Sequence, residues 1–160
     1  MLGKLLVVPA KNGKRVSGKI VVLSRESSSG TYVFFREHVM DNEPYRPDAL
    51  LLTSTRAIEQ ELSQNPNGIG YGGEAYFKGK PSLKILPISA GEGKPAISPS
   101  NENVTSGKYP VARKLYVYSS GEPTGVAAEF LQFCRGSEGQ KIVEQIGYVP
   151  LPAPGKVAGR

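Results

Sequence analysis

Cysteine and histidine are nearly absent from this sequence, and each scarcity excludes a class of site. The single cysteine, Cys134, excludes an internal disulfide framework and a multi-cysteine metal site. The single histidine, His38, argues against a histidine-based metal centre and against a Ser-His-Asp triad. We therefore expect no metal and no other cofactor.

Long apolar runs and common catalytic loop motifs are also missing. No apolar run approaches the roughly 18 residues that a membrane-spanning helix needs, so the sequence predicts no such span. The G-x-S-x-G nucleophile turn and the G-x-x-x-x-G-K-[ST] nucleotide loop are not found. We therefore do not expect an enzyme.

The composition that remains is that of a soluble globular protein. Hydrophobic residues make up 39% and charged residues 21% of the 160 residues, which is typical of a folded chain. This length favours one domain, perhaps divided into two small lobes. Nineteen glycines and 13 prolines indicate many turns and loops.

The positive charge is concentrated at the amino end. The chain has a formal net charge of +6, and its first 20 residues hold five basic side chains and no acidic ones. A basic patch can attract nucleic acid. Glycine, serine and valine separate these charges, however, and no aromatic side chain lies among them. We interpret residues 1–19 as a solvated basic segment and expect no nucleic-acid partner.

The first ten residues resemble an export signal only superficially. Their apolar stretch is short, and Lys11 follows it at once. The chain as given therefore shows no signal peptide, which by itself would predict a cytoplasmic protein.

Strand and helix patterns alternate along the rest of the chain. Apolar or alternating segments predict strands at 20–23, 69–73, 83–88 and 109–118. Helices are predicted over 32–40, over 124–134 and over 137–146, and a further helix is predicted to follow the cap residues 53–55. The helix 137–146 is indicated by a capping-box spacing at Ser137 and Gln140. This order predicts an α/β fold with a mostly parallel sheet flanked by helices. Residues 89–107 lack periodicity and mark a candidate boundary.

Arg25 and the segment Ser29-Gly30-Thr31 form the one constellation with a clear chemical use. They lie between the predicted strand 20–23 and the helix that follows. A helix start leaves amides without acceptors, glycine lets an anion approach, and hydroxyls and a guanidinium add donors. The segment therefore predicts a cradle for a tetrahedral oxyanion. The alternative is a serine-rich cap on an ordinary helix, with Arg25 in a surface ion pair, for example with Glu26.

Several segments in order resemble one known family. The stretch Ile20-Val-Val-Leu-Ser-Arg-Glu-Ser-Ser-Ser-Gly-Thr-Tyr-Val-Phe-Phe35 resembles the second-lobe phosphate loop of the PstS family, the phosphate-binding receptors of ABC phosphate importers. The likeness continues, through roughly residue 151, at 54–58, 65–71, 101–104, 109–118, 138–143 and 147–151.

The resemblance implies a fold, a function and a location. It implies a type II periplasmic-binding-protein fold, with Arg25, Ser29, Gly30 and Thr31 as the phosphate-binding residues. It also implies a periplasmic or cell-surface solute-binding protein that works with the membrane subunits of an ABC importer. Arg113 matches the segment that returns from the second lobe, where it either forms a structural pair or points to the hinge.

The family's first lobe has no counterpart in residues 1–19, so the resemblance covers a C-terminal portion only. We expect a basic segment at 1–19, a second-lobe-like domain at 20–98, a return strand and helices at 99–151, and a flexible tail at 152–160. With the first lobe largely missing, phosphate binding is expected to be weak. The alternative is a structural or interaction protein that keeps the fold without binding a ligand.

The two C-terminal helices lack the sheet that would cover them in this family. Their apolar side chains Phe130, Leu131, Ile142 and Ile146 then need another surface. We expect self-association through these helices, or attachment to a partner chain.

Overall fold

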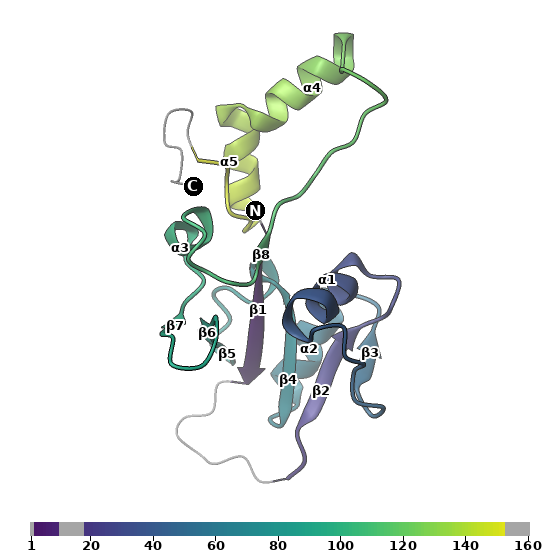
Figure 1. Cartoon of the computed structure of the whole chain (residues 1–160), viewed down its shortest axis with the longest axis vertical. Coiled ribbons are helices and arrows are strands. Elements are labelled where there is room, and N and C mark those ends of the chain that lie inside the picture. Colours follow the sequence, from purple (N-terminus) through teal and green to yellow (C-terminus); the bar gives the residue numbers. More distant parts are fainter. Residues whose placement is uncertain (1, 10–17, 153–160) are drawn as a thin grey trace.

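Three parallel strands form one half of the main sheet. The computed structural model describes residues 2–9 and 18–152. Strand β2 (Val21–Arg25) lies between β3 (Leu50–Leu52) and β4 (Gly68–Gly73), and it is parallel to both. Figure 1 shows these strands side by side. Leu23 of β2 is fully buried, as the apolar segment 20–23 predicts.

A strand that the sequence analysis did not predict completes the sheet. Strand β1 (Leu2–Pro9) pairs in the antiparallel direction with β4, with β5 (Leu83–Ile85) and with β8 (Ala112–Arg113). The sheet order is β3-β2-β4-β1-β5. Strands β2, β3, β4 and β5 thus share one direction, and β1 alone opposes them. The charge pattern of residues 1–19 gave no sign of this strand. Three of the five basic residues in this segment, Lys11, Lys14 and Arg15, lie outside the described residues.

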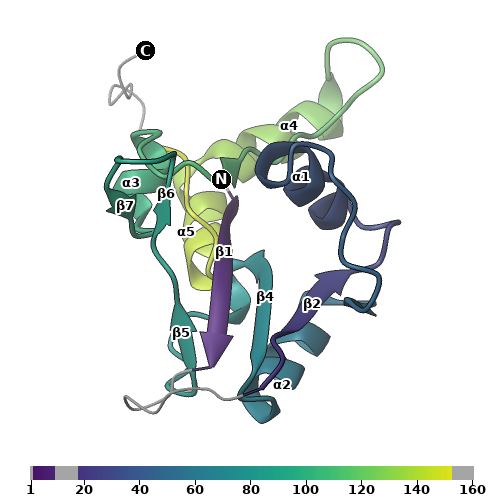
Figure 2. The same ribbon diagram turned by 60° about the horizontal axis from the view of Figure 1, so that its bottom comes forward.

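Two capped helices follow the parallel strands. Helix α1 (Gly30–Val39) begins after the N-cap Ser29, and α2 (Thr55–Gln64) begins after the N-cap Ser54. The Ser54 hydroxyl oxygen accepts a hydrogen bond from the Ala57 amide at 3.0 Å. Ile58 and Leu62 of α2 are fully buried, and Figure 2 shows α2 behind β2 and β4. Both predicted helices are confirmed.

The glycines of β4 allow α2 to approach the sheet. A Cβ on Gly68 would lie 2.9 Å from a methyl group of Leu62, and one on Gly70 would lie 2.8 Å from a methyl group of Ile58. Glycine in a strand often marks a site where another backbone approaches closely. The structure shows that side chains of a helix approach instead.

One hydrophobic core includes residues from both sides of the expected boundary between residues 98 and 99. Its buried members are Leu23, Ile58, Leu62, Phe77, Leu83, Val104, Tyr109, Val111 and Val149. The segment without periodicity forms a two-stranded sheet, β6 (Ile88–Ser89) with β7 (Ala96–Ile97), and then α3 (Asn101–Thr105). Val104 of α3 is only 1% exposed, so this segment is anchored in the core.

The C-terminal part lies away from the sheet. Of the predicted strand 109–118 only the two residues of β8 are paired, and Leu115 to Tyr118 are exposed. Helices α4 (Gly125–Arg135) and α5 (Ser137–Gln145) pack on each other, and α4 has no buried residue. Figure 1 shows both helices projecting beyond the strands. Of the expected tail at 152–160, residues 153–160 lie outside the described residues.

The start of α5 differs from the capping box that was predicted. Gly136 is the N-cap, so Ser137 is already the first helical residue and its side chain makes no cap hydrogen bond. Gln140 instead donates to the Cys134 carbonyl oxygen at 2.7 Å and accepts from the Leu151 amide at 2.6 Å. Its side chain therefore ties α5 to the end of α4 and to the segment after α5. Gly147, which follows the predicted helix 137–146, has a φ of +82°, which glycine tolerates.

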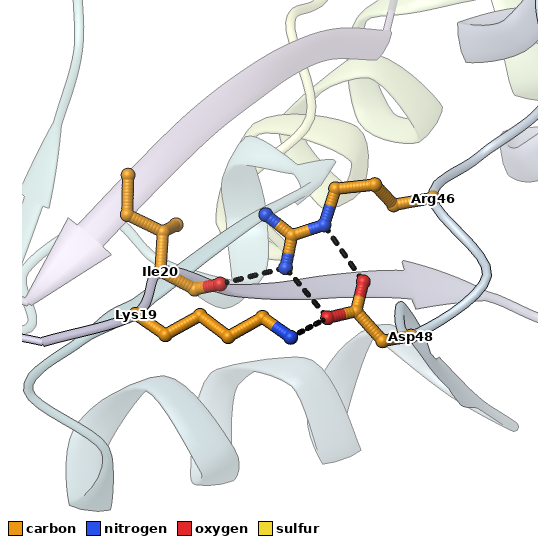
Figure 3. A network of polar contacts seen from close by, with 4 residues as sticks. All are labelled: Lys19, Ile20, Arg46 and Asp48. Carbon is orange, nitrogen blue, oxygen red and sulfur yellow. Dashed lines mark hydrogen bonds and ion pairs between the residues drawn. The ribbon is translucent and has the colours of Figure 1, made fainter.

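A surface network joins the start of β2 to the loop before β3. Arg46 donates to both carboxylate oxygens of Asp48, at 2.7 and 3.0 Å, and to the Ile20 carbonyl oxygen at 3.0 Å. Lys19 also pairs with Asp48 (Figure 3). The hydrogen bonds from Arg46 and Lys19 hold the pKa of Asp48 well below its usual range. Since these groups are exposed, the network fixes geometry more than it adds stability.

Two classes of feature are not found among the described residues. No helix there has the length and apolar character needed to cross a membrane. Nor do those residues bring together three histidine, cysteine, aspartate or glutamate side chains in a group that could hold a metal ion.

Gly72 offers a test of the contact between β4 and α2. A Cβ at Gly72 would lie 2.3 Å from Cγ2 of Thr55 and 2.9 Å from the Phe77 ring. We expect Gly72→Ala to lower the free energy of unfolding by about 1–3 kcal/mol, the usual cost of overpacking a core. Thr55→Ser removes that methyl group, so the cost of Gly72→Ala should be smaller in a Thr55→Ser background. Equal costs in urea unfolding of the two backgrounds would contradict this.

Candidate functional site

The residues predicted to bind an anion lie at the carboxyl edge of the parallel strands. Arg25 is the last residue of β2 and is paired with Leu52, the last residue of β3. The Glu26 amide donates to the Leu52 carbonyl oxygen at 3.1 Å, and the chain then turns into α1. In open α/β sheets, ligands bind at this edge because helix starts and strand ends meet there. The structure thus brings Arg25 and the start of α1 to one edge.

Ser29 both caps α1 and keeps a donor for a ligand. Its hydroxyl oxygen accepts from the Thr31 amide at 3.1 Å, and its amide donates to the Glu26 carbonyl oxygen at 3.0 Å. The cap leaves the Ser29 hydroxyl proton available to another acceptor. The amides of Gly30 and Tyr32 have no acceptor within the helix at this position. Gly30 is exposed, so an anion can approach these amides.

Arg25 is held by the start of α2. Its Nη2 donates to the Thr53 carbonyl oxygen at 2.9 Å, and its Nη1 donates to the Thr55 hydroxyl oxygen at 3.3 Å. Its Nε is buried and has no hydrogen-bond partner. Among the described residues, the ion pairs do not include Arg25, so the alternative of a surface pair with Glu26 is not what the structure shows. A guanidinium has five N–H donors, and these two contacts leave others for an anion.

A chain of hydroxyl groups lies behind Arg25. The hydroxyl oxygen of Ser24, which is fully buried, lies 2.7 Å from that of Tyr71, and the Tyr71 oxygen lies 2.7 Å from that of Tyr45. Burial, followed by the hydrogen bond with Tyr71, raises the pKa of Tyr45. The Tyr71 ring also stacks on Phe35 of α1, with 4.0 Å between ring centroids. These contacts fix β2 and α1 relative to each other.

Sequence reasoning did not identify this hydroxyl chain. The predicted strand ends at residue 23, yet the structure places Ser24 inside β2. The signal in the sequence was the position of Ser24, one residue after the apolar Leu23. In a sheet with helices on both faces, two successive residues of a strand are both buried. A serine buried there needs a hydrogen-bond partner.

Arg113 is a second guanidinium near the start of α1. A Cβ placed on Gly30 would lie 3.8 Å from Nη2 and 3.9 Å from Nη1 of Arg113. From the sequence alone, Arg113 either forms a structural pair or points to the hinge. In the structure its guanidinium lies against the first turn of α1.

A family comparison identifies the class of protein. A family model described as the PBP superfamily domain matches residues 11–138. The chain therefore belongs to the PBP superfamily, and the expected α/β class of the type II periplasmic-binding proteins is confirmed.

Individual relatives carry phosphate-binding names. The chain is 33% identical over 138 residues to the phosphate-binding protein PstS of Pseudomonas aeruginosa. The aligned region covers 84% of this chain and 42% of that protein. It is 30% identical over 155 residues to PstS of Bacillus subtilis, covering 94% and 49% of the two chains. The chain thus spans less than half the length of these relatives. Their names are those of binding proteins, in agreement with the expectation that this chain is not an enzyme.

Solved structures share the fold. A protein of Clostridium perfringens, crystallised with phosphate bound, superposes with a TM-score of 0.75 at 24% identity, covering 94% of this chain and 69% of that one. PstS of Borrelia burgdorferi gives a TM-score of 0.67 at 21% identity, covering 95% and 70%.

Glu74 is a buried carboxyl group near the same edge of the sheet. It begins a short 3-10 helix, η1 (Glu74–Tyr76), directly after β4. Its Oε2 is buried without a hydrogen-bond partner, and its Oε1 lies 3.9 Å from Nζ of Lys78. Burial raises the pKa of Glu74, and the charge of Lys78 offsets only part of this effect.

The raised pKa predicts that Glu74→Gln stabilises the protein at neutral pH. The folded state holds this proton more tightly than the unfolded state, so wild-type stability falls as pH rises through the window above the ordinary carboxyl pKa of about 4.3. We expect a gain of about 1 kcal/mol at neutral pH, because glutamine keeps the shape of the side chain and removes the charge that burial disfavours. The gain should vanish in acid, as urea unfolding across pH would show.

Glu138 provides the matched control. Its carboxylate is exposed and pairs with Lys141 at 2.9 Å, so Glu138→Gln should give no comparable gain. A stability difference for Glu74→Gln that does not change with pH would contradict the assignment.

Proposed function

We propose that this chain binds inorganic phosphate, or a similar tetrahedral oxyanion, through Arg25, Ser29, Gly30 and Thr31. The observation that carries the proposal is the meeting of Arg25 with the open start of α1 at one edge of the sheet. The guanidinium supplies charge and a planar fork for two oxygens. The Ser29 hydroxyl, the first amides of the helix and the Thr31 side chain supply further donors. The printed names of the relatives support phosphate as the ligand.

The open geometry argues for modest affinity. Charge-assisted hydrogen bonds contribute about 1.5–3 kcal/mol each, and association itself has a large entropic cost. Gly30, Ser27 and Ser28 are exposed, so water competes for the same donors. We expect a dissociation constant near 1 mM, or about −4 kcal/mol, for the chain by itself.

The proposed role is that of a solute-binding component in ABC phosphate transport. The partners would be phosphate and the membrane subunits of an importer, and the place of action would be the periplasm or cell surface. The support is the shared fold and the similarity to proteins named PstS. The competing proposal is a structural or interaction protein that has the fold without ligand affinity.

Calorimetry with inorganic phosphate separates these two proposals. The wild type should give saturable heat, and Arg25→Ala should weaken binding by about tenfold or more, since it removes charge-assisted hydrogen bonds. Arg46→Ala is the matched control, because Arg46 carries the same charge but pairs with Asp48. Identical heats from the wild type and Arg25→Ala would favour the interaction protein.

We also propose that the C-terminal helices mediate self-association. Exposed apolar side chains line α4 and α5, with exposures of 81% for Val126, 59% for Phe130, 48% for Phe133, 48% for Ile142 and 56% for Ile146. Helices with this much exposed apolar surface favour a partner surface. A second copy of the chain offers the same faces and can form a two-fold interface.

Sedimentation tests this association. The wild type should form dimers or larger species, and Phe130→Glu should shift it toward monomer by placing a charge in the apolar face. Ile20→Glu is the control, because Ile20 is also exposed, at 55%, but lies outside the C-terminal helices. A wild type that sediments only as a monomer at high concentration would contradict the proposal.

A further inference from the structure

The sheet topology brings Arg113 to the candidate anion site. Strand β8 pairs with the first residues of β1, with Arg113 opposite Leu2. The next part of β1 pairs with the end of β4, Lys4 lying opposite Gly73. Because β4 is parallel to β2, this end of β4 and the end of β2 lie at the same edge of the sheet. Arg113 therefore reaches the edge where α1 begins, although it lies 88 positions after Arg25 in the sequence (113 − 25).

The Arg113 guanidinium lies along the first turn of α1. Its terminal nitrogens lie 3.8 and 3.9 Å from the Cβ position of Gly30. Its Cζ lies 5.6 Å from the centre of the Phe34 ring, one turn further along the helix. Glycine at position 30 leaves the space between this guanidinium and the helix backbone unfilled. The ring of Phe34 limits the positions that the guanidinium can adopt.

This placement joins two positive groups with no negative partner. The amino end of α1 carries about half a positive charge, and its first turn contains no acidic residue. Among the described residues, the ion pairs do not include Arg113. Its Nε is also buried without a hydrogen-bond partner. A cation beside the positive end of a helix is unfavourable unless an anion lies between them.

We propose that Arg113 is a further anion-binding residue of this site. Its guanidinium and the first turn of α1 contact the same phosphate, so the anion is held by donors from α1 and from the return segment together. The proposal rests on the proposed function, because it takes inorganic phosphate as the ligand. It adds a second arginine to the residues that the loop motif indicates. It also connects ligand occupancy to the short pairing of β8 with β1.

Titration with inorganic phosphate, followed by the amide chemical shift of Gly30, tests this role. Arg113→Gln should weaken phosphate binding by about tenfold or more, the effect of losing a charge-assisted contact. Arg113→Lys keeps the charge but loses the planar fork, so its affinity should lie between those of the wild type and Arg113→Gln. Lys114→Gln removes the same charge from the exposed neighbouring residue and should change affinity less than about twofold, because exposed charges are screened.

The outcomes separate this inference from the proposed function. A wild type whose Gly30 shift does not respond to phosphate overturns the phosphate-binding function. A wild type that binds, with Arg113→Gln binding as tightly as Lys114→Gln, overturns the role of Arg113 and leaves that function intact. If circular dichroism shows that Arg113→Gln is unfolded, Arg113→Lys decides: wild-type affinity overturns the role, and weaker binding supports it.

Discussion

Because β1 runs antiparallel to β4, its amino end lies at the edge of the sheet where the parallel strands end. That pairing places β8, and with it Arg113, beside the start of α1. Arg25 arrives at the same edge through the parallel pairing of β2 with β3. The candidate site is therefore built from both strand directions. A fully parallel sheet of the same strands would carry the first residues of β1 to the opposite edge.

Several positive groups meet at this edge of the sheet. Two arginines each bury an Nε without a partner, and the helix beside them begins without an acidic residue. Glu74, a buried carboxyl group near this edge, contacts Lys78 instead, and burial raises its pKa. These positive groups favour an anion at this edge.

The sequence was most informative where local signals and packing agreed. The caps at 53–55 and the apolar segment 20–23 predicted their elements because short-range chemistry determines them. It was less informative about β1, whose role depends on pairing with residues about 65 positions away in sequence (73 − 4 = 69 and 70 − 7 = 63). The same holds for Arg113, whose neighbours Gly30 and Phe34 are joined to it only by sheet topology.

The short pairing of β8 affects how the two parts of the chain can move. Only Ala112 and Arg113 are hydrogen-bonded to the sheet, and the exposed segment from Leu115 to Tyr118 continues to α4. Backbone groups that bond to water instead of a neighbouring strand are released at low cost. The chain can therefore bend most easily at this segment before α4, whereas the end of α5 stays anchored, since Val149 is only 2% exposed and belongs to the core.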